Sequence, residues 1–131
     1  MKAKLINEEP KTYAVIFETG EEVMEGLQNL ARELSLETCQ LTAIGAFSEV
    51  MLGYFNLEKK DYKKIPVNEQ VEVLSLIGDI TANEGQPQIH AHVVLGRSDA
   101  TTLGGHLISA RVRPTLEVIL TESPPAFGTL G

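Results

Sequence analysis

The chain has 131 residues, 43% hydrophobic and 22% charged, which is ordinary for one globular domain. Acidic residues outnumber basic residues 18 to 11, and the net charge of −7 argues against a free-standing DNA-binding protein, because such proteins need Lys and Arg at phosphates. The single Cys39 excludes an intramolecular disulfide and is interpreted as a buried apolar residue. No long apolar run and no secretory signal pattern are present, so we expect a cytoplasmic protein that does not enter membranes.

The N-terminal part of the chain predicts two short strands and then a helix. Residues 1–20 are rich in β-branched and aromatic residues, and the pair Glu9-Pro10 divides them into two strands. Over residues 21–34 the spacing of apolar residues changes to that of a helix. Two glutamates lie at its start, where the helix dipole favours negative charge. The residues expected on its buried face are Val23, Leu27, Leu30, Ala31 and Leu34.

The rest of the chain predicts strands. The long β-type run of residues 38–55 contains Gly45, which indicates a bulge, a sharp bend or a close backbone approach. Further strands are expected near 62–65 and at 70–80, 89–96, 106–112 and 114–123, with a loop at 81–88, a turn region at 97–105 and a tail at 124–131. Most connections are too short for crossover helices. We therefore expect an α+β fold in a single domain over residues 1–131, a largely antiparallel sheet of about seven or eight strands with one main helix packed on it.

All three histidines of the chain lie in one hairpin-like segment, "IHAHVVLGRSDATTLGGHL". His90 and His92 are two residues apart on a predicted strand, so their side chains point to the same face. If the turn region folds the next strand back against this one, His106 comes alongside as a third imidazole. Gly104 and Gly105 directly before it allow a close backbone approach or an unusual φ.

Three neutral imidazoles at His90, His92 and His106 suit Zn²⁺ best, with Ni²⁺, Co²⁺ or Fe²⁺ as alternative divalent metals. Three protein ligands leave a fourth position for water or substrate, which is the pattern of catalytic rather than closed structural zinc sites. The opposing interpretation is that these are ordinary sheet histidines that hydrogen-bond or face solvent. The third histidine after Gly-Gly, with none elsewhere in the chain, favours the metal site.

Other polar residues each have a structural and a functional interpretation. Glu72 lies in an apolar strand, where a carboxylate needs a partner. It either hydrogen-bonds to backbone amides or an arginine, or it orients one of the histidines or acts as a general base. Glu117 shares this ambiguity. Arg111 and Arg113 can hold an anionic ligand, although a salt bridge at the rim is the simpler interpretation. The lysine-rich stretch 59–64 is interpreted as a solvated loop.

Several stretches together carry a family resemblance. They are "HAHVVLG", "LGGHL", "ETGEEVMEGLQNLARE", "LTAIGAFSEVMLGYF", "VEVLSLIGDI" and "PTLEVILTE". In this combination the chain resembles the plant and prokaryote conserved (PPC) domain in its stand-alone prokaryotic form. The match spans nearly the whole chain, and Ala43 stands at the first glycine of the family's Gly-x-Gly-Ala region.

This resemblance implies an α+β domain with one main helix, commonly assembled as a trimer. It also implies metal binding through the H-x-H and GGH histidines, which are His90, His92 and His106 here. Plant members carry AT-hook motifs beside the domain, and no Arg-Gly-Arg-Pro motif occurs in this chain, so direct DNA binding is not expected. The activity of the family is generally unassigned, and the resemblance supplies no reaction.

Two functions remain open at this point. The first is an oligomeric, zinc-type metal-binding protein of unassigned activity that binds a small molecule at an open metal position, as a sensor or a hydrolase-like enzyme. The second is a non-catalytic interaction module or DNA-associated regulatory module, in which the metal is structural or incidental. Both predict a metal ion, and they differ in whether exchangeable water occupies the open position.

Overall fold

The computed structural model describes residues 1–123, so the expected tail at 124–131 lies outside the described residues. Seven strands and one α-helix make up this part of the chain. In chain order they are β1 (Lys2–Glu8), β2 (Lys11–Glu18), α1 (Val23–Glu33), β3 (Thr38–Asn56), β4 (Asp61–Val67), β5 (Val71–Asn83), β6 (Gln86–Gly96) and β7 (Thr102–Glu122). No helix among the described residues is long and apolar enough to cross a membrane.

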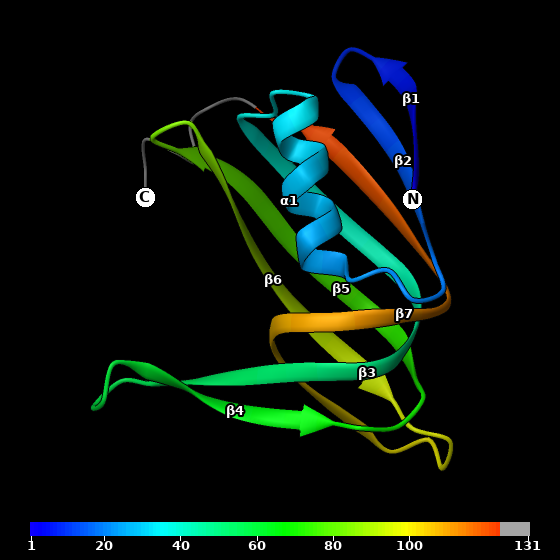
Figure 1. Ribbon diagram of the computed structural model, residues 1–131, viewed down its shortest axis with the longest axis vertical. Helices are drawn as coiled ribbons and strands as arrows, with labels where there is room; N and C mark the ends of the chain where they lie inside the picture. Colours follow the sequence, from blue (N-terminus) through cyan, green and yellow to red (C-terminus); the bar gives the residue numbers. More distant parts are fainter. Residues whose placement is uncertain (124–131) are drawn as a thin grey trace.

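The strands form one antiparallel sheet that closes on itself. Their order is β1-β2-β7-β6-β5-β3-β4, and β7 also pairs with β3. The strands β3, β5, β6 and β7 therefore form a ring, and β3 and β7 are long, bent strands that run through both ends of it (Figure 1). The β3–β4 hairpin extends away from the part of the molecule that α1 covers (Figure 1).

Gly45 marks an irregularity in β3, as the sequence predicts. The pairing register of β3 with β5 shifts between Ala43 and Gly45. A Cβ atom at Gly45 would clash with the backbone carbonyl oxygen of Thr115 on β7. Glycine is therefore needed for β3 and β7 to approach closely at this point.

The start of α1 is fixed to the sheet by Glu22. The carboxylate of Glu22 accepts hydrogen bonds from the backbone N–H groups of Met24 at 3.1 Å and Glu25 at 2.8 Å. It also accepts one from the backbone N–H of Ala110 on β7, at 2.8 Å. One side chain thus caps the helix and ties its first turn to β7, because a helix N-terminus leaves donors without partners inside the helix.

Part of the core lies between α1 and the sheet. The helix residues buried there are Val23, Leu27, Leu30 and Ala31. Leu34, which the helical spacing also places on this face, is 36% exposed, because the helix ends at Glu33 and Leu34 is its C-cap. Cys39 is buried, as predicted, and burial raises the pKa of its thiol to about 11, so that the thiol stays protonated.

Three segments differ from the expectation. Residues 102–105, expected within the turn region, are the first residues of β7. Residues 81–88, expected as a loop, continue β5 and β6 into a hairpin whose turn residues Glu84 and Gly85 both have positive φ, as a two-residue turn requires. The strands expected at 106–112 and 114–123 are one strand, β7. Pro114 is tolerated inside it because β3 makes no pairing with β7 between Val112 and Leu116. The fold is therefore mainly β, with one helix on seven antiparallel strands.

Candidate metal centre

The structure brings the three histidines together. β6 and β7 pair so that His92 and His106 are direct partners across the ladder. His90 is two residues earlier on β6 and points to the same face. The ligating nitrogens of the three imidazoles all lie within 4.8 Å of one another, and no other group of this kind occurs among residues 1–123. The structure thus confirms the predicted proximity of the three histidines.

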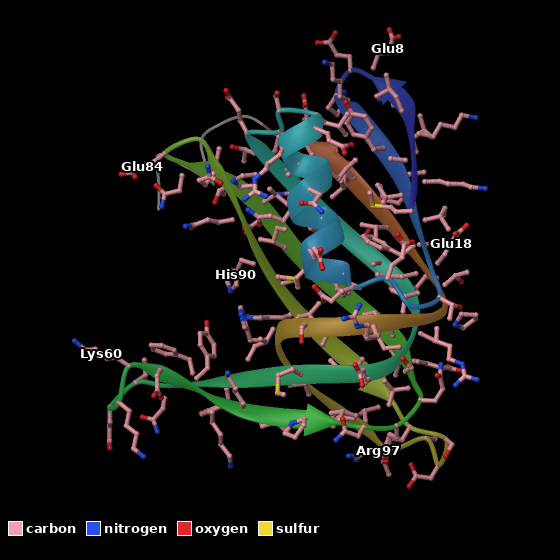
Figure 2. The ribbon with its side chains drawn as sticks, in the orientation of Figure 1. Glu8, Glu18, Lys60, Glu84, His90 and Arg97 are labelled. Atoms are coloured by element: carbon pink, nitrogen blue, oxygen red, sulfur yellow. The ribbon has the colours of Figure 1, made fainter. Side chains whose placement is uncertain are left out.

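The three rings lie close enough to one another that small side-chain rotations would bring their nitrogens to one metal ion. The ring centroids are 5.0 Å apart for His90 and His92, 5.4 Å for His90 and His106, and 5.8 Å for His92 and His106. Nitrogens bound tetrahedrally to one zinc ion are about 3.4 Å apart. Small side-chain rotations complete that approach, and the exposed His90 and His92 are free to make them. Figure 2 shows His90 on β6, with Lys60 at the far tip of the β3–β4 hairpin.

His106 is held in place by an aromatic ring from another strand. Gly53 on β3 is a ladder partner of His106. A Cβ atom at Gly53 would lie 2.9 Å from the ring of Tyr62, so the absence of a side chain lets the Tyr62 ring lie over this position. The rings of Tyr62 and His106 are stacked, with centroids 4.6 Å apart and planes at 23°. β4 thereby restricts the imidazole from one side.

The electrostatic surroundings keep His106 neutral. Burial lowers the pKa of His106 below its ordinary value of 6.5, and the neighbouring His90 and His92 lower it further. The Nδ1 atom of His106 is buried and has no hydrogen-bond partner among the described residues. A buried imidazole nitrogen without a partner is costly, and a metal ion or a ligand would satisfy it. The residues present therefore fit a transition metal.

The other predicted site residues lie elsewhere. Glu72 is exposed, and its ladder partner is Gly96, four residues from His92 and roughly 13 Å along an extended strand. It therefore needs no buried partner, contrary to the expectation from its apolar strand, because strand alternation places it on the outer face. Glu117 is also exposed. Arg111 donates a hydrogen bond to the carbonyl oxygen of Gly20 at 3.1 Å.

Arg111 and Arg113 are exposed, and neither forms an ion pair within residues 1–123, so the predicted rim salt bridge is not present there. The lysine-rich stretch 59–64 is exposed, as predicted, but it includes the start of β4 as well as a turn. Asp99 is a turn residue whose carboxylate accepts hydrogen bonds from the backbone N–H and the hydroxyl of Thr101, at 2.9 and 2.6 Å.

Sequence reasoning missed the residues that surround the histidines. A hollow of about 650 Å³ lies beside His92 and His106. Its remaining walls come from the β3–β4 hairpin, β5, β6 and β7, and its larger side chains are Tyr54, Phe55, Leu57, Tyr62, Ile77 and Val94. Asp79 was also missed: it is the ladder partner of His90, but it does not line the hollow. The available signal was the group of aromatic residues before and within the lysine-rich stretch, namely Tyr54, Phe55 and Tyr62.

Comparison with known proteins identifies the family. No curated protein matches the chain. The chain is similar to the crystal structure of a plant- and prokaryote-conserved protein from Pyrococcus horikoshii, at 35% identity and a TM-score of 0.82 over 92% of this chain and 81% of that one. It is also similar to a candidate DNA-binding protein from Bacteroides thetaiotaomicron, at 30% identity and a TM-score of 0.86 over 92% and 82% of the two chains.

A metal-containing protein from Archaeoglobus fulgidus is similar at 29% identity and a TM-score of 0.79, over 94% of this chain and 86% of that one. The family model of the Plants and Prokaryotes Conserved domain matches residues 6–124, which is nearly the whole chain. The resemblance seen in the sequence motifs is confirmed by this match. The protein belongs to the Plants and Prokaryotes Conserved domain family.

Proposed function

We propose that this protein binds one divalent transition metal ion per chain through His90, His92 and His106. The observation that carries the proposal is the convergence of three ligating nitrogens within 4.8 Å of one another on one face of the sheet. The buried, unpartnered Nδ1 of His106 supports it, as does the lowered pKa that keeps this imidazole neutral. Zinc is the first expectation, because it accepts three imidazoles together with an exchangeable ligand.

The donor set also supports an open position for an exogenous ligand. A bound divalent ion would supply Lewis acidity and would lower the pKa of a water molecule that it holds. The three imidazoles would hold the ion, and Tyr62 would restrict the rotation of His106. Among the described residues the cluster includes no carboxylate or thiolate that would close the coordination sphere. The similar Archaeoglobus fulgidus protein is metal-containing, which is in keeping with this role.

Elemental analysis of protein purified without a histidine tag tests the proposal. We expect close to one transition metal ion per chain, either as purified or after Zn²⁺ or Co²⁺ is added to the metal-free protein. The absence of stoichiometric metal under both conditions would leave the histidines as ordinary sheet residues. Water exchange at bound Co²⁺ then separates the two functional classes, because a sensor or an enzyme needs exchangeable water and a structural metal does not.

We also propose that the protein is a homotrimer assembled through the outer face of the sheet. Apolar side chains gather there without cover, namely Ile44, Leu74 and Ile119. Light scattering at micromolar concentration should give three times the chain mass. Ile44→Asp should dissociate the assembly, because the charge would be buried at the contact. Ile6→Asp is the matched control, since Ile6 is similarly exposed but lies on the edge strand β1. A monomer mass for the unchanged protein would reject the trimer.

A further inference from the structure

We propose that the ligand of the metal centre is a small organic carboxylate with an aromatic or branched aliphatic body, and that this body occupies the hollow beside His92 and His106. The inference rests on the proposed metal site and specifies the class of molecule that completes it. Its basis is the contrast between the two parts of the site. One part would present a positive ion, and the other part is apolar and uncharged.

Charge decides what the metal position accepts. Three neutral imidazoles leave the full double positive charge of a divalent ion uncompensated. None of the described residues that line the hollow is Asp, Glu, Lys or Arg, so no acidic side chain offsets this charge from inside it. Asp79 stands opposite His90 on β5 but is outside the cluster of converging donors. An uncompensated charge beside an apolar wall is costly, so an anionic donor is favoured over a neutral one. A carboxylate is the organic anion that zinc-type ions bind readily.

The residues that line the hollow indicate which chemical group is attached to the carboxylate. Phe55 and Tyr62 meet edge to face with ring centroids 5.2 Å apart, and they form an aromatic wall next to His106. Leu57 and Val94 extend the apolar lining, and both are exposed, at 80% and 44%. Covering this surface would stabilise a complex by removing apolar area from water. Aromatic side chains of this kind also favour stacked or edge-on contacts with a planar ring.

The size of the hollow limits the occupant to a small molecule. A volume of about 650 Å³ is in the middle of the range for sites that take drug-sized or metabolite-sized ligands. Acetate alone would fill little of it, so the body of the ligand should contribute most of the binding free energy. An acidic peptide is a less suitable occupant, because none of the described residues that line the hollow is a Lys or Arg that could bind a second carboxylate.

Cobalt-substituted protein provides the test, because the visible spectrum of bound Co²⁺ reports directly on its coordination sphere. The protein is loaded with one Co²⁺ per chain and titrated separately with 3-phenylpropionate, acetate and the neutral 3-phenylpropionamide. We expect 3-phenylpropionate to change the spectrum at a concentration at least tenfold lower than acetate. We expect the amide to leave the spectrum unchanged at the concentration at which the carboxylate saturates.

Two surface variants locate the body of the ligand. Val94→Thr keeps the shape of the side chain and replaces one methyl group with a hydroxyl, and Leu57→Ser removes an exposed apolar group. Each variant should reduce the advantage of 3-phenylpropionate over acetate to threefold or less. Ile6→Thr is the control, because Ile6 is an exposed apolar residue on the edge strand β1, outside both the hollow and the proposed assembly face, and it should keep the full advantage. Circular dichroism and light scattering confirm that each variant retains its fold and its mass.

The outcomes separate the two proposals. If Co²⁺ does not bind in stoichiometric amount, the proposed metal function fails, and the carboxylate proposal fails with it. If Co²⁺ binds, but 3-phenylpropionate and acetate change its spectrum at the same concentration, only the carboxylate proposal is overturned. The same conclusion follows if the amide changes the spectrum as effectively as the acid, or if Val94→Thr and Leu57→Ser keep the full advantage.

Discussion

A Cβ atom on Gly104 would lie 2.6 Å from the backbone carbonyl oxygen of Val93 on the neighbouring strand. β6 and β7 therefore approach each other more closely at this point than any residue with a side chain allows. Two residues further along β7, His106 faces His92 across the same ladder. The close approach thus belongs to the backbone arrangement that sets the distance between two of the three imidazoles.

Replacing Gly104 by Ala should destabilise the fold and weaken metal binding together. The methyl group would have to push against backbone, which costs about 1–3 kcal/mol of unfolding free energy in a packed structure. Gly96→Ala is the control on the same hairpin, because its nearest neighbour would be a flexible side-chain atom of Leu74 at 3.1 Å. Urea unfolding and metal content are measured for both. Equal losses for the two variants would contradict the role of the close approach.

Removal of single imidazoles should lower the metal content strongly. His90→Ala, His92→Ala and His106→Ala each leave two ligands, and His90→Ala/His92→Ala leaves one, which should abolish binding. Gln88→Ala is the matched control, because Gln88 is exposed on the same face of β6, two residues before His90. Metal per chain is measured by elemental analysis. Full occupancy in any of the single variants would remove that histidine from the donor set.

Stability of the metal-free protein should fall as pH drops below about 6.5, because the unfolded His106 takes up a proton that the folded state resists. The pKa is lowered in the folded state by burial first and by His90 and His92 second. Below 6.5 the unfolded chain therefore binds more protons than the folded chain, and the loss continues down to the lowered pKa. Urea midpoints at pH 7.5 and 5.5, with chelator present, measure it. His106→Gln should show a smaller loss over this interval, and an equal or larger loss would exclude His106 as the cause.

Leu30→Ala should lower the unfolding free energy by about 2–5 kcal/mol, because Leu30 is only 3% exposed on the inner face of α1. Leu34→Ala removes the same atoms from the exposed C-cap and should cost well under 1 kcal/mol. Thermal or urea unfolding of the two variants measures the contrast. A cost below about half a kcal/mol for Leu30→Ala would show that the helix does not bury this face.

Duplex DNA should bind no more tightly than about 10⁻⁴–10⁻⁶ M at physiological salt. The net charge of −7 opposes binding, and any phosphate contacts are expected from the lysine-rich stretch 59–64 and the pair Arg111 and Arg113. Fluorescence anisotropy over a range of salt concentrations measures the affinity. Nanomolar, salt-sensitive binding by the isolated protein would favour the DNA-associated module over the small-molecule function.

The local patterns of the sequence were sufficient for most of the fold. Glu9-Pro10, the helical spacing from Val23 to Ala31 and the glycine at position 45 all predict features that the structure contains. The sequence predicts two strands that meet at Pro114, whereas the structure has one, because whether a proline interrupts a strand depends on which neighbour needs its missing N–H. That neighbour is set by the β3–β7 pairing, between residues far apart in the sequence.

The candidate site shows the same division between local and non-local information. The side chains of His90 and His92 share a face because of strand alternation, and His106 joins them through a short hairpin. The stack of Tyr62 on His106 depends on three strands at once, because Tyr62 reaches over Gly53 of β3 to a residue of β7. The apolar residues around Glu72 suggest burial, but strand alternation directs its side chain to solvent.

The pairing of His106 with His92 on one side and Gly53 on the other makes the donor set preorganised. A backbone that is hydrogen-bonded on both flanks does not have to be ordered when an ion arrives, unlike small zinc domains that fold only with their metal. The affinity for the proposed ion should therefore include no cost of folding the backbone, only that of ordering the exposed side chains of His90 and His92. Loss of the proposed ion should leave the fold intact, so that binding and release could be repeated on one folded chain.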